Sequence, residues 1–411
     1  MVNQNDNNFN ARHMIEALRS GIPSREVGYC FSFARARIMR EIGNELKKVA
    51  EGGQSGGMFV SGKYGEGKTH LLNTVFNMAQ EKNMAVSFVS LSKETPFDKP
   101  YMVYSKVVQN TYLPGRPLPG FGHIFDGMTQ KSPLALELCE FCLKHLETDK
   151  LYYVLKSYLA TEDVDEKFML MADMEGDFMA NATVKSIYRR IYSEKVNFSE
   201  NFNKFRHAWD YFSFLNQLIL KSGCSGWVLL FDEAELVGRL SKKARQSSYI
   251  NMSRFIHPEK PANLKSAYSI FAFNASFIPD VIEGKQEYDN IEQNPISPEM
   301  DRRIKTVLNH ISTAPQLVPL NRDEIMAVLE KIQELHGTAY NWEPGADMEE
   351  LFSAAERRGY LLRTRIRAAV EILDQLYQYG SAGDIKVNKL EEASYSEEVS
   401  DAPPEEPDAD F

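Results

Sequence analysis

Hydrophobic positions along the chain follow two different periods. Residues 11–50 repeat apolar side chains at helical spacing and predict two N-terminal helices. The run GGMFVSG (56–62) predicts a short strand, residues 70–82 predict a helix, and AVSFVSLS (85–92) predicts a second, buried strand. A strand, a glycine loop, a helix and a strand make a βαβ unit. The pattern therefore predicts an α/β fold with a parallel sheet flanked by helices.

The rest of the chain also alternates between helical and strand-like segments, with longer helical stretches between the strands. A mostly helical stretch predicts a long insertion at about 110–225, and strand-like runs follow at 226–231, 269–277 and 314–320. Helical patterns over 321–337 and 348–380 then predict a small C-terminal helical lid, the first helix ending at Gly337. The expected parts are an N-terminal helical segment, a main α/β domain, the lid and a tail, at residues 1–57, 58–320, 321–388 and 389–411.

Composition and charge place the 411 residues among ordinary soluble globular proteins, with 43% apolar and 25% charged residues. The net charge of −10 is concentrated in residues 389–411, where nine carboxylates stand against one lysine and leave only −2 for the rest. An acidic tail with so few apolar groups is expected to be disordered. It would act as a solvating segment or as a binding segment for a partner.

Targeting signals and cysteine chemistry add little to this picture. The opening MVNQNDNNFN is polar, and no stretch approaches about 18 consecutive apolar residues, so we expect a cytoplasmic protein without membrane contact. The four cysteines are too few and scattered for a disulfide framework. Cys139 and Cys142 form a CxxC without a second ligand pair nearby, and we expect both to be core residues.

One glycine-rich loop carries a phosphate-binding motif. It fits G-x-x-x-x-G-K-[ST] in full, directly after a predicted strand and before a predicted helix. Its glycines allow backbone N–H groups to turn toward phosphate oxygens, and the helix adds the positive end of its dipole. The expected nucleotide-binding residues are Gly62, Lys63, Tyr64, Gly65, Glu66, Gly67, Lys68, Thr69 and the adjacent His70. Lys68 is expected to bridge the β- and γ-phosphates of ATP, and the Thr69 hydroxyl to ligate Mg²⁺.

Two acidic residues follow a second apolar strand. In WVLLFDEAE the strand ends at Asp232 and Glu233, at the carboxyl end where ligands sit in open parallel sheets. Asp232 is expected to orient a Mg²⁺-bound water, and Glu233 to act as general base on the attacking water. The second acid favours hydrolysis over a small-molecule kinase reaction. A solvated loop start is the alternative interpretation of this pair.

Polar residues further along are weaker candidates for catalysis. Asn274 ends the next strand, where it would contact the γ-phosphate or the attacking water, or would simply form a turn. Arg302 and Arg303 would supply an arginine finger to a neighbouring subunit, or surface salt bridges. Arg363 begins the last helix and would reach the γ-phosphate within its own subunit. Arg365 and Arg367 lie in the same segment and either could take that role instead, or all three could be surface charges.

With these residues in place, the chain resembles the ATP-binding proteins of BREX phage-defence loci, which resemble the origin-recognition branch of AAA+ ATPases. The resemblance is carried by ARHMIEALRSGIPSREV, GKYGEGKTHLL, VSLSKETPFDKPYMVYSKVVQN and LLFDEAE. It implies an AAA+ ATPase with the motif roles given above, working on or near DNA with other defence-system proteins. Two features depart from the pattern: an acidic tail follows the lid instead of a winged helix, and the helical insertion has no simple counterpart.

The sequence leaves two functions open. One is an ATP-hydrolysing motor or loader that remodels a DNA–protein assembly, with a homo-oligomer on ATP binding implied by a finger arginine. The other is a nucleotide-switched scaffold that hydrolyses slowly and recruits a partner through the helical insertion. Direct DNA contact stays open as well, although the basic clusters are only local and the pattern favours a solvated helix face over a DNA-binding patch. The most basic of them is the run 239–245, RLSKKAR.

Overall fold

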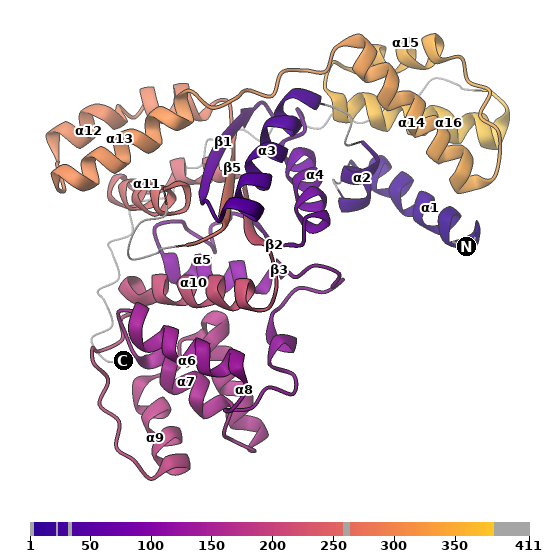
Figure 1. Cartoon of the computed structure of the whole chain (residues 1–411). Coiled ribbons are helices and arrows are strands. Elements are labelled where there is room, and N and C mark those ends of the chain that lie inside the picture. The colour runs from indigo at the N-terminus through magenta and orange to yellow at the C-terminus, as the bar shows by residue number, and fades with distance from the viewer. Residues whose placement is uncertain (1–3, 22–23, 32–34, 258–263, 382–411) are drawn as a thin grey trace. The chain divides into compact units, whose positions relative to one another are not determined.

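Figure 1 shows the computed structural model of the chain, which describes residues 4–21, 24–31, 35–257 and 264–381. The acidic segment 389–411 lies outside these residues. The chain divides into two compact units, and the predicted domain boundaries stay predictions. Of the described residues, the first unit comprises 4–21, 24–31, 35–43, 60–78 and 315–381, and the second comprises 44–59, 79–257 and 264–314.

The sheet has five strands in the order β1-β5-β4-β2-β3. β4 pairs in parallel with β2 and with β5, so that Val228 lies opposite Val86 on one side and Tyr268 on the other. β3 pairs antiparallel with β2 at the edge. The predicted α/β fold with a mainly parallel sheet is therefore confirmed. The strands are β1 (Gly56–Gly62), β2 (Met84–Ser90), β3 (Thr111–Tyr112), β4 (Gly226–Asp232) and β5 (Ala267–Asn274).

The central strands are apolar because helices cover both faces of the sheet. Every residue of β4 is buried, as in parallel strands that contact helices on each side. Phe231 stacks on Phe271 of β5 with 4.5 Å between ring centroids. Phe97 and Phe255 pack edge-on against Phe231. These rings form the centre of the core of the second unit.

Two details of the strand prediction are wrong. The run 314–320 forms no strand and makes only an isolated bridge, from Gln316 to Ser61. Prolines 315 and 319 lack the N–H that a longer ladder would need, and hydrogen bonds remain only from Ser61 N to Pro315 O and from Leu317 N to Ser61 O. The edge strand β3 was not predicted, because two residues show no periodicity.

Between β2 and β4 the chain is mainly helical, as the pattern predicts. Lys150 and Asp173 form an ion pair of 2.8 Å with both side chains fully buried, and Tyr211 donates a hydrogen bond to Asp173. Such added hydrogen bonds offset the cost of removing two charges from water. Cys142 is buried and is a free thiol. The helices are α5 (Pro100–Gln109), α6 (Pro133–His145), α7 (Lys150–Tyr158), α8 (Val164–Ala172), α9 (Asn181–Tyr192) and α10 (Lys204–Lys221).

After β4 the second unit continues through three further helices. α11 (Lys242–Ile256) precedes β5, and α12 (Glu287–Gln293) and α13 (Pro298–Ser312) follow it. α11 contacts α13. Arg245 of α11 donates a buried hydrogen bond of 2.6 Å to Glu287 of α12, which joins these two helices.

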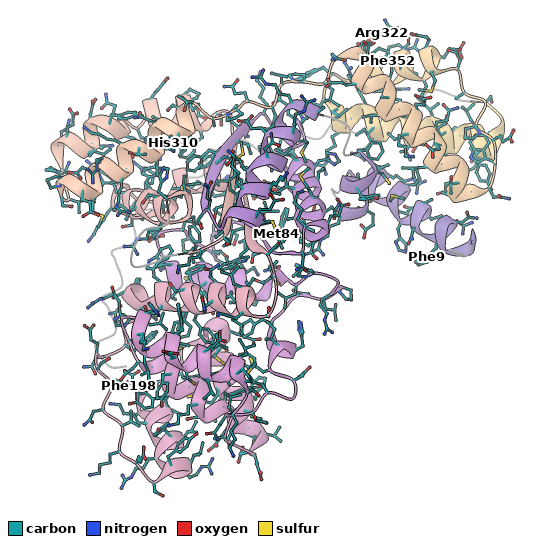
Figure 2. All side chains as sticks on the ribbon, viewed as in Figure 1. Phe9, Met84, Phe198, His310, Arg322 and Phe352 are labelled. Atoms are coloured by element: carbon teal, nitrogen blue, oxygen red, sulfur yellow. The ribbon has the colours of Figure 1, made fainter. Side chains whose placement is uncertain are left out.

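The first unit joins the N-terminal helices to the C-terminal helices in one core. Ile15 of α1 is buried with Leu329 of α14 and Leu373 of α16, and Arg19 pairs with Asp374 at 2.8 Å. Figure 2 shows Arg322 beside Phe352, and its guanidinium lies 5.1 Å from the ring centroid. The helices are α1 (Gln4–Ser20), α2 (Arg25–Cys30), α3 (Ala36–Gly52, which continues into the second unit), α4 (Lys68–Glu81), α14 (Arg322–Tyr340), α15 (Met348–Arg358) and α16 (Leu362–Tyr379).

The two ends of α14 are set by different asparagines. Asn321 caps the N-terminus as part of a capping box with Glu324. The helix does not end at Gly337 but continues to Tyr340, where Asn341 takes the left-handed conformation at φ 54°. Gly337 is a close-approach position instead, because a Cβ there would lie 2.9 Å from the Trp342 carbonyl oxygen.

Candidate nucleotide-binding site

The phosphate-binding motif lies in the strand, loop and helix that the sequence predicts. β1 ends at Gly62 and α4 begins at Lys68. Gly65 and Gly67 have φ values of 79° and 86°, in the left-handed region that favours glycine. A Cβ at Gly62 would lie 3.1 Å from the side chain of Leu317. The three motif glycines are therefore required by the backbone path and by packing.

Hydrogen bonds within the loop hold its polar side chains in place. Lys68 Nζ donates to the carbonyl oxygens of Gly62 at 2.9 Å and Lys63 at 3.3 Å. The Glu66 carboxylate accepts from the Lys63 backbone N–H at 2.6 Å and closes the turn. Among the described residues the Lys68 ammonium donates only to neutral oxygens, so an anionic phosphate is a stronger partner for it.

His70 and Thr69 lie in the first turn of α4. His70 Nε2 is 3.4 Å from the Phe31 carbonyl oxygen, beyond the end of α2. Burial is the main reason that the pKa of His70 is lowered, and the nearby Arg35 adds to the effect. The imidazole is therefore neutral at pH 7. His70 links the loop helix to the N-terminal segment, while Thr69 is the second residue of α4.

Arg35 is a loop contact that the sequence did not indicate. Its guanidinium donates to the carbonyl oxygen of Glu66 in the loop and, at 2.8 Å, to that of Val318. Its backbone has φ 64°, an uncommon value for a residue other than glycine. Arg35 therefore links the phosphate loop by hydrogen bonds to the segment that leads into α14. Only its place in a local basic cluster was visible in the sequence.

The three lid arginines have different partners. Arg363 Nη1 donates to the Tyr64 hydroxyl of the phosphate loop at 3.0 Å. Arg365 instead donates to the Gly359 carbonyl oxygen at 3.1 Å. Arg367 donates to the Arg19 carbonyl oxygen at 3.1 Å. Of the three candidates, Arg363 is the one that the structure brings to the loop.

The acidic pair lies in the second unit, at the carboxyl end of β4. Asp232 is buried, and its Oδ1 accepts a hydrogen bond of 3.0 Å from the Glu233 backbone N–H. Glu233 is exposed and takes the left-handed conformation with φ 57°. A non-glycine residue held in this conformation costs of order 1–3 kcal/mol, and such residues cluster at functional sites.

Asn274 lies at the corresponding end of β5, the parallel neighbour of β4. Its Oδ1 accepts from the Ser276 backbone N–H at 3.1 Å, which is the turn-forming role. Its own backbone N–H donates to Glu235 at 3.1 Å. Within the described part of the chain the Asn274 Nδ2 has no hydrogen-bond partner, so this donor is available to a ligand.

Arg302 and Arg303 on α13 have different environments. Arg303 pairs with Glu299 at 3.0 Å and is only 16% exposed. Arg303 also contributes to the lowered pKa of Arg254, whose main cause is burial. The Arg302 side chain is exposed and forms no ion pair with any described residue. Arg302 is therefore better placed than Arg303 to reach another molecule.

Comparison with known proteins identifies the family. The profile of the family described as BREX system ATP-binding protein BrxC/D matches residues 7–131 and 155–390. The chain belongs to this family. The matched ranges include the phosphate loop, the acidic pair, Asn274 and the lid arginines. The predicted resemblance to BREX ATP-binding proteins is confirmed.

Other comparisons add little to this assignment. The Walker-type ATPase PABY2304 of Pyrococcus abyssi is a solved structure with 13% sequence identity and a TM-score of 0.35, over 83% of this chain and 67% of that one. No curated protein matches the sequence significantly. None of the described helices combines the length and apolar character that crossing a bilayer requires.

Proposed function

We propose that this BREX family member binds ATP with Mg²⁺ on residues 62–69 and hydrolyses it to ADP and phosphate. The observation that carries the proposal is the phosphate loop itself. Its glycines lie at positive φ, and Lys68 is held on neutral carbonyl oxygens next to the first turn of α4. The loop N–H groups and the helix dipole favour an anion there. The family description supports ATP binding.

In this proposal some residues of the chain bind ATP and its metal ion, and others take part in the hydrolysis. Lys68 holds the β- and γ-phosphates, and Thr69 and Asp232 are the groups suited to Mg²⁺, which would screen the phosphate charge. Glu233 takes the proton of the attacking water. Asn274 Nδ2 orients that water or the γ-phosphate, and Arg363 contacts the γ-phosphate from the lid.

The cellular role that we propose is to drive or gate a phage-defence assembly in the cytoplasm, with other BREX proteins and DNA as candidate partners. Family membership supports the protein partners.

The scaffold alternative has one observation in its favour. On α8, Val164 and Phe168 are 78% and 75% exposed one helical turn apart, so the described residues leave an apolar face of this helix uncovered.

ATP turnover, measured with and without DNA and purified BREX partners, tests the proposal. A motor or loader hydrolyses ATP and accelerates when its partners are added. A scaffold binds ATP, turns it over slowly whether or not they are present, and loses partner binding when Val164 and Phe168 are replaced by serine. Absence of ATP binding contradicts both functions.

Arg302 provides a prediction about assembly. If Arg302 reaches the γ-phosphate of an adjacent protomer, the Arg302→Ala variant binds ATP normally but loses most of its turnover. Arg303→Ala is the matched control, because Arg303 is half-buried and paired with Glu299. Mixing Arg302→Ala with a variant that lacks the base restores part of the activity, since some interfaces then combine an intact base with an intact finger. A monomeric wild type with a concentration-independent rate contradicts the prediction.

A further inference from the structure

The third residue of the phosphate loop, Tyr64, contacts the lid. Its ring is 47% exposed, and its hydroxyl accepts a hydrogen bond of 3.0 Å from Arg363 Nη1. The lid approaches the same loop at a second point, where Leu361 lies 3.7 Å from the position of a Cβ on Gly65. Both contacts lie within the first unit. The loop and the start of α16 are therefore adjacent.

The surroundings of Arg363 fix its position and leave its charge unneutralised. A Cβ on Gly21, at the end of α1, would lie 2.4 Å from Arg363 Nε, so the arginine packs directly on this backbone. Among the described residues Nε is buried without a hydrogen-bond partner. No described carboxylate lies within ion-pair distance of the guanidinium. The hydroxyl of Tyr64 is thus its one side-chain partner in the described chain.

A neutral partner has a specific consequence for a phosphate-binding arginine. A carboxylate would hold the guanidinium but would also cancel its charge, and ATP would have to displace it. A hydroxyl uses one N–H of Nη1 and leaves the net charge and the remaining terminal N–H groups for a ligand. An arginine already held in place loses less side-chain entropy when the ligand arrives.

We propose that Tyr64 is a positioning residue for ATP, which holds Arg363 beside the phosphate loop so that its guanidinium meets the terminal phosphate. The proposal rests on the proposed ATP-binding function and goes beyond it. ADP lacks the phosphate that Arg363 would contact. Tyr64 therefore contributes to the preference for ATP over ADP, although its own side chain carries no charge.

Equilibrium binding of ATP and ADP to the full chain tests this role. We expect Tyr64→Phe to weaken ATP binding about three- to tenfold, the range of one hydrogen bond, and to leave ADP binding unchanged. In the Arg363→Ala background the same substitution has no further effect, because the group that Tyr64 positions is absent. Tyr360→Phe is the control, since Tyr360 is exposed in the same lid segment and its hydroxyl makes no hydrogen bond with any described residue.

Other results contradict the proposal in distinguishable ways. Equal weakening of ATP and ADP shows that Tyr64 shapes the loop and does not act through Arg363. Unchanged or tighter ATP binding shows that the hydrogen bond has no positioning effect or competes with the ligand. In each of these cases the wild type still binds ATP, so the proposed function survives. A wild type that binds no ATP contradicts both.

Discussion

Replacing Glu233 with glutamine is expected to leave ATP bound while lowering its turnover by at least about 10²-fold, the usual contribution of a general base. Glutamine keeps the shape and the hydrogen-bonding capacity of the side chain but cannot accept the proton of the attacking water. Glu233 is exposed at the end of β4, and its backbone N–H is held by Asp232. The substitution therefore removes the proton-accepting group of one exposed side chain while keeping its size and shape.

Single-turnover measurements separate the two steps for this variant. Binding is followed with a fluorescent ATP analogue and hydrolysis by phosphate release. Glu283→Gln is the matched control, because Glu283 is an exposed carboxylate in the same unit, in the segment Ile278–Glu283. Turnover at the wild-type rate in Glu233→Gln would show that another group activates the water. Loss of ATP binding would show that Glu233 serves binding.

Lys68→Ala is expected to weaken ATP binding by about 10²–10³-fold, the size of effect seen when one member of a close charge pair is truncated. Lys68 is the motif cation that we propose holds the β- and γ-phosphates. In the described part of the chain its ammonium donates only to carbonyl oxygens of its own loop, at Gly62 and Lys63. The fold does not depend on these contacts, so the variant should retain its helical content and its unfolding temperature.

Calorimetric titration with ATP and circular dichroism check this expectation. Lys63→Ala is the control in the same loop, because the Lys63 side chain is exposed. The hydrogen bonds that Lys63 makes with the described residues use its backbone atoms. If Lys68→Ala loses ATP binding and Lys63→Ala keeps it, the result places the phosphates of ATP at the Lys68 side chain. Wild-type affinity in Lys68→Ala would exclude residues 62–69 as the nucleotide site.

The sequence by itself determined the parts of this protein that depend on local pattern. The order of strand, glycine loop and helix around residues 62–69 is visible because the motif, the apolar strand and the helical period all lie within about 25 residues. Asp232 at the end of a buried strand is visible for the same reason, because a continuous apolar run predicts a parallel strand. The N-terminal segments and the motifs also indicated the family.

Tertiary structure alone decided the contacts between distant segments. Arg35 bonds to Glu66 and Val318, and Tyr64 bonds to Arg363 across 299 positions, so no local period could indicate either pair. Arg363, Arg365 and Arg367 are equivalent in composition, and packing against Gly21 and the loop distinguishes the first from the others. The spacing of hydrophobic residues predicts which face of a segment is buried. The partner of a polar group, in contrast, depends on which backbone atoms the completed fold brings within hydrogen-bonding distance.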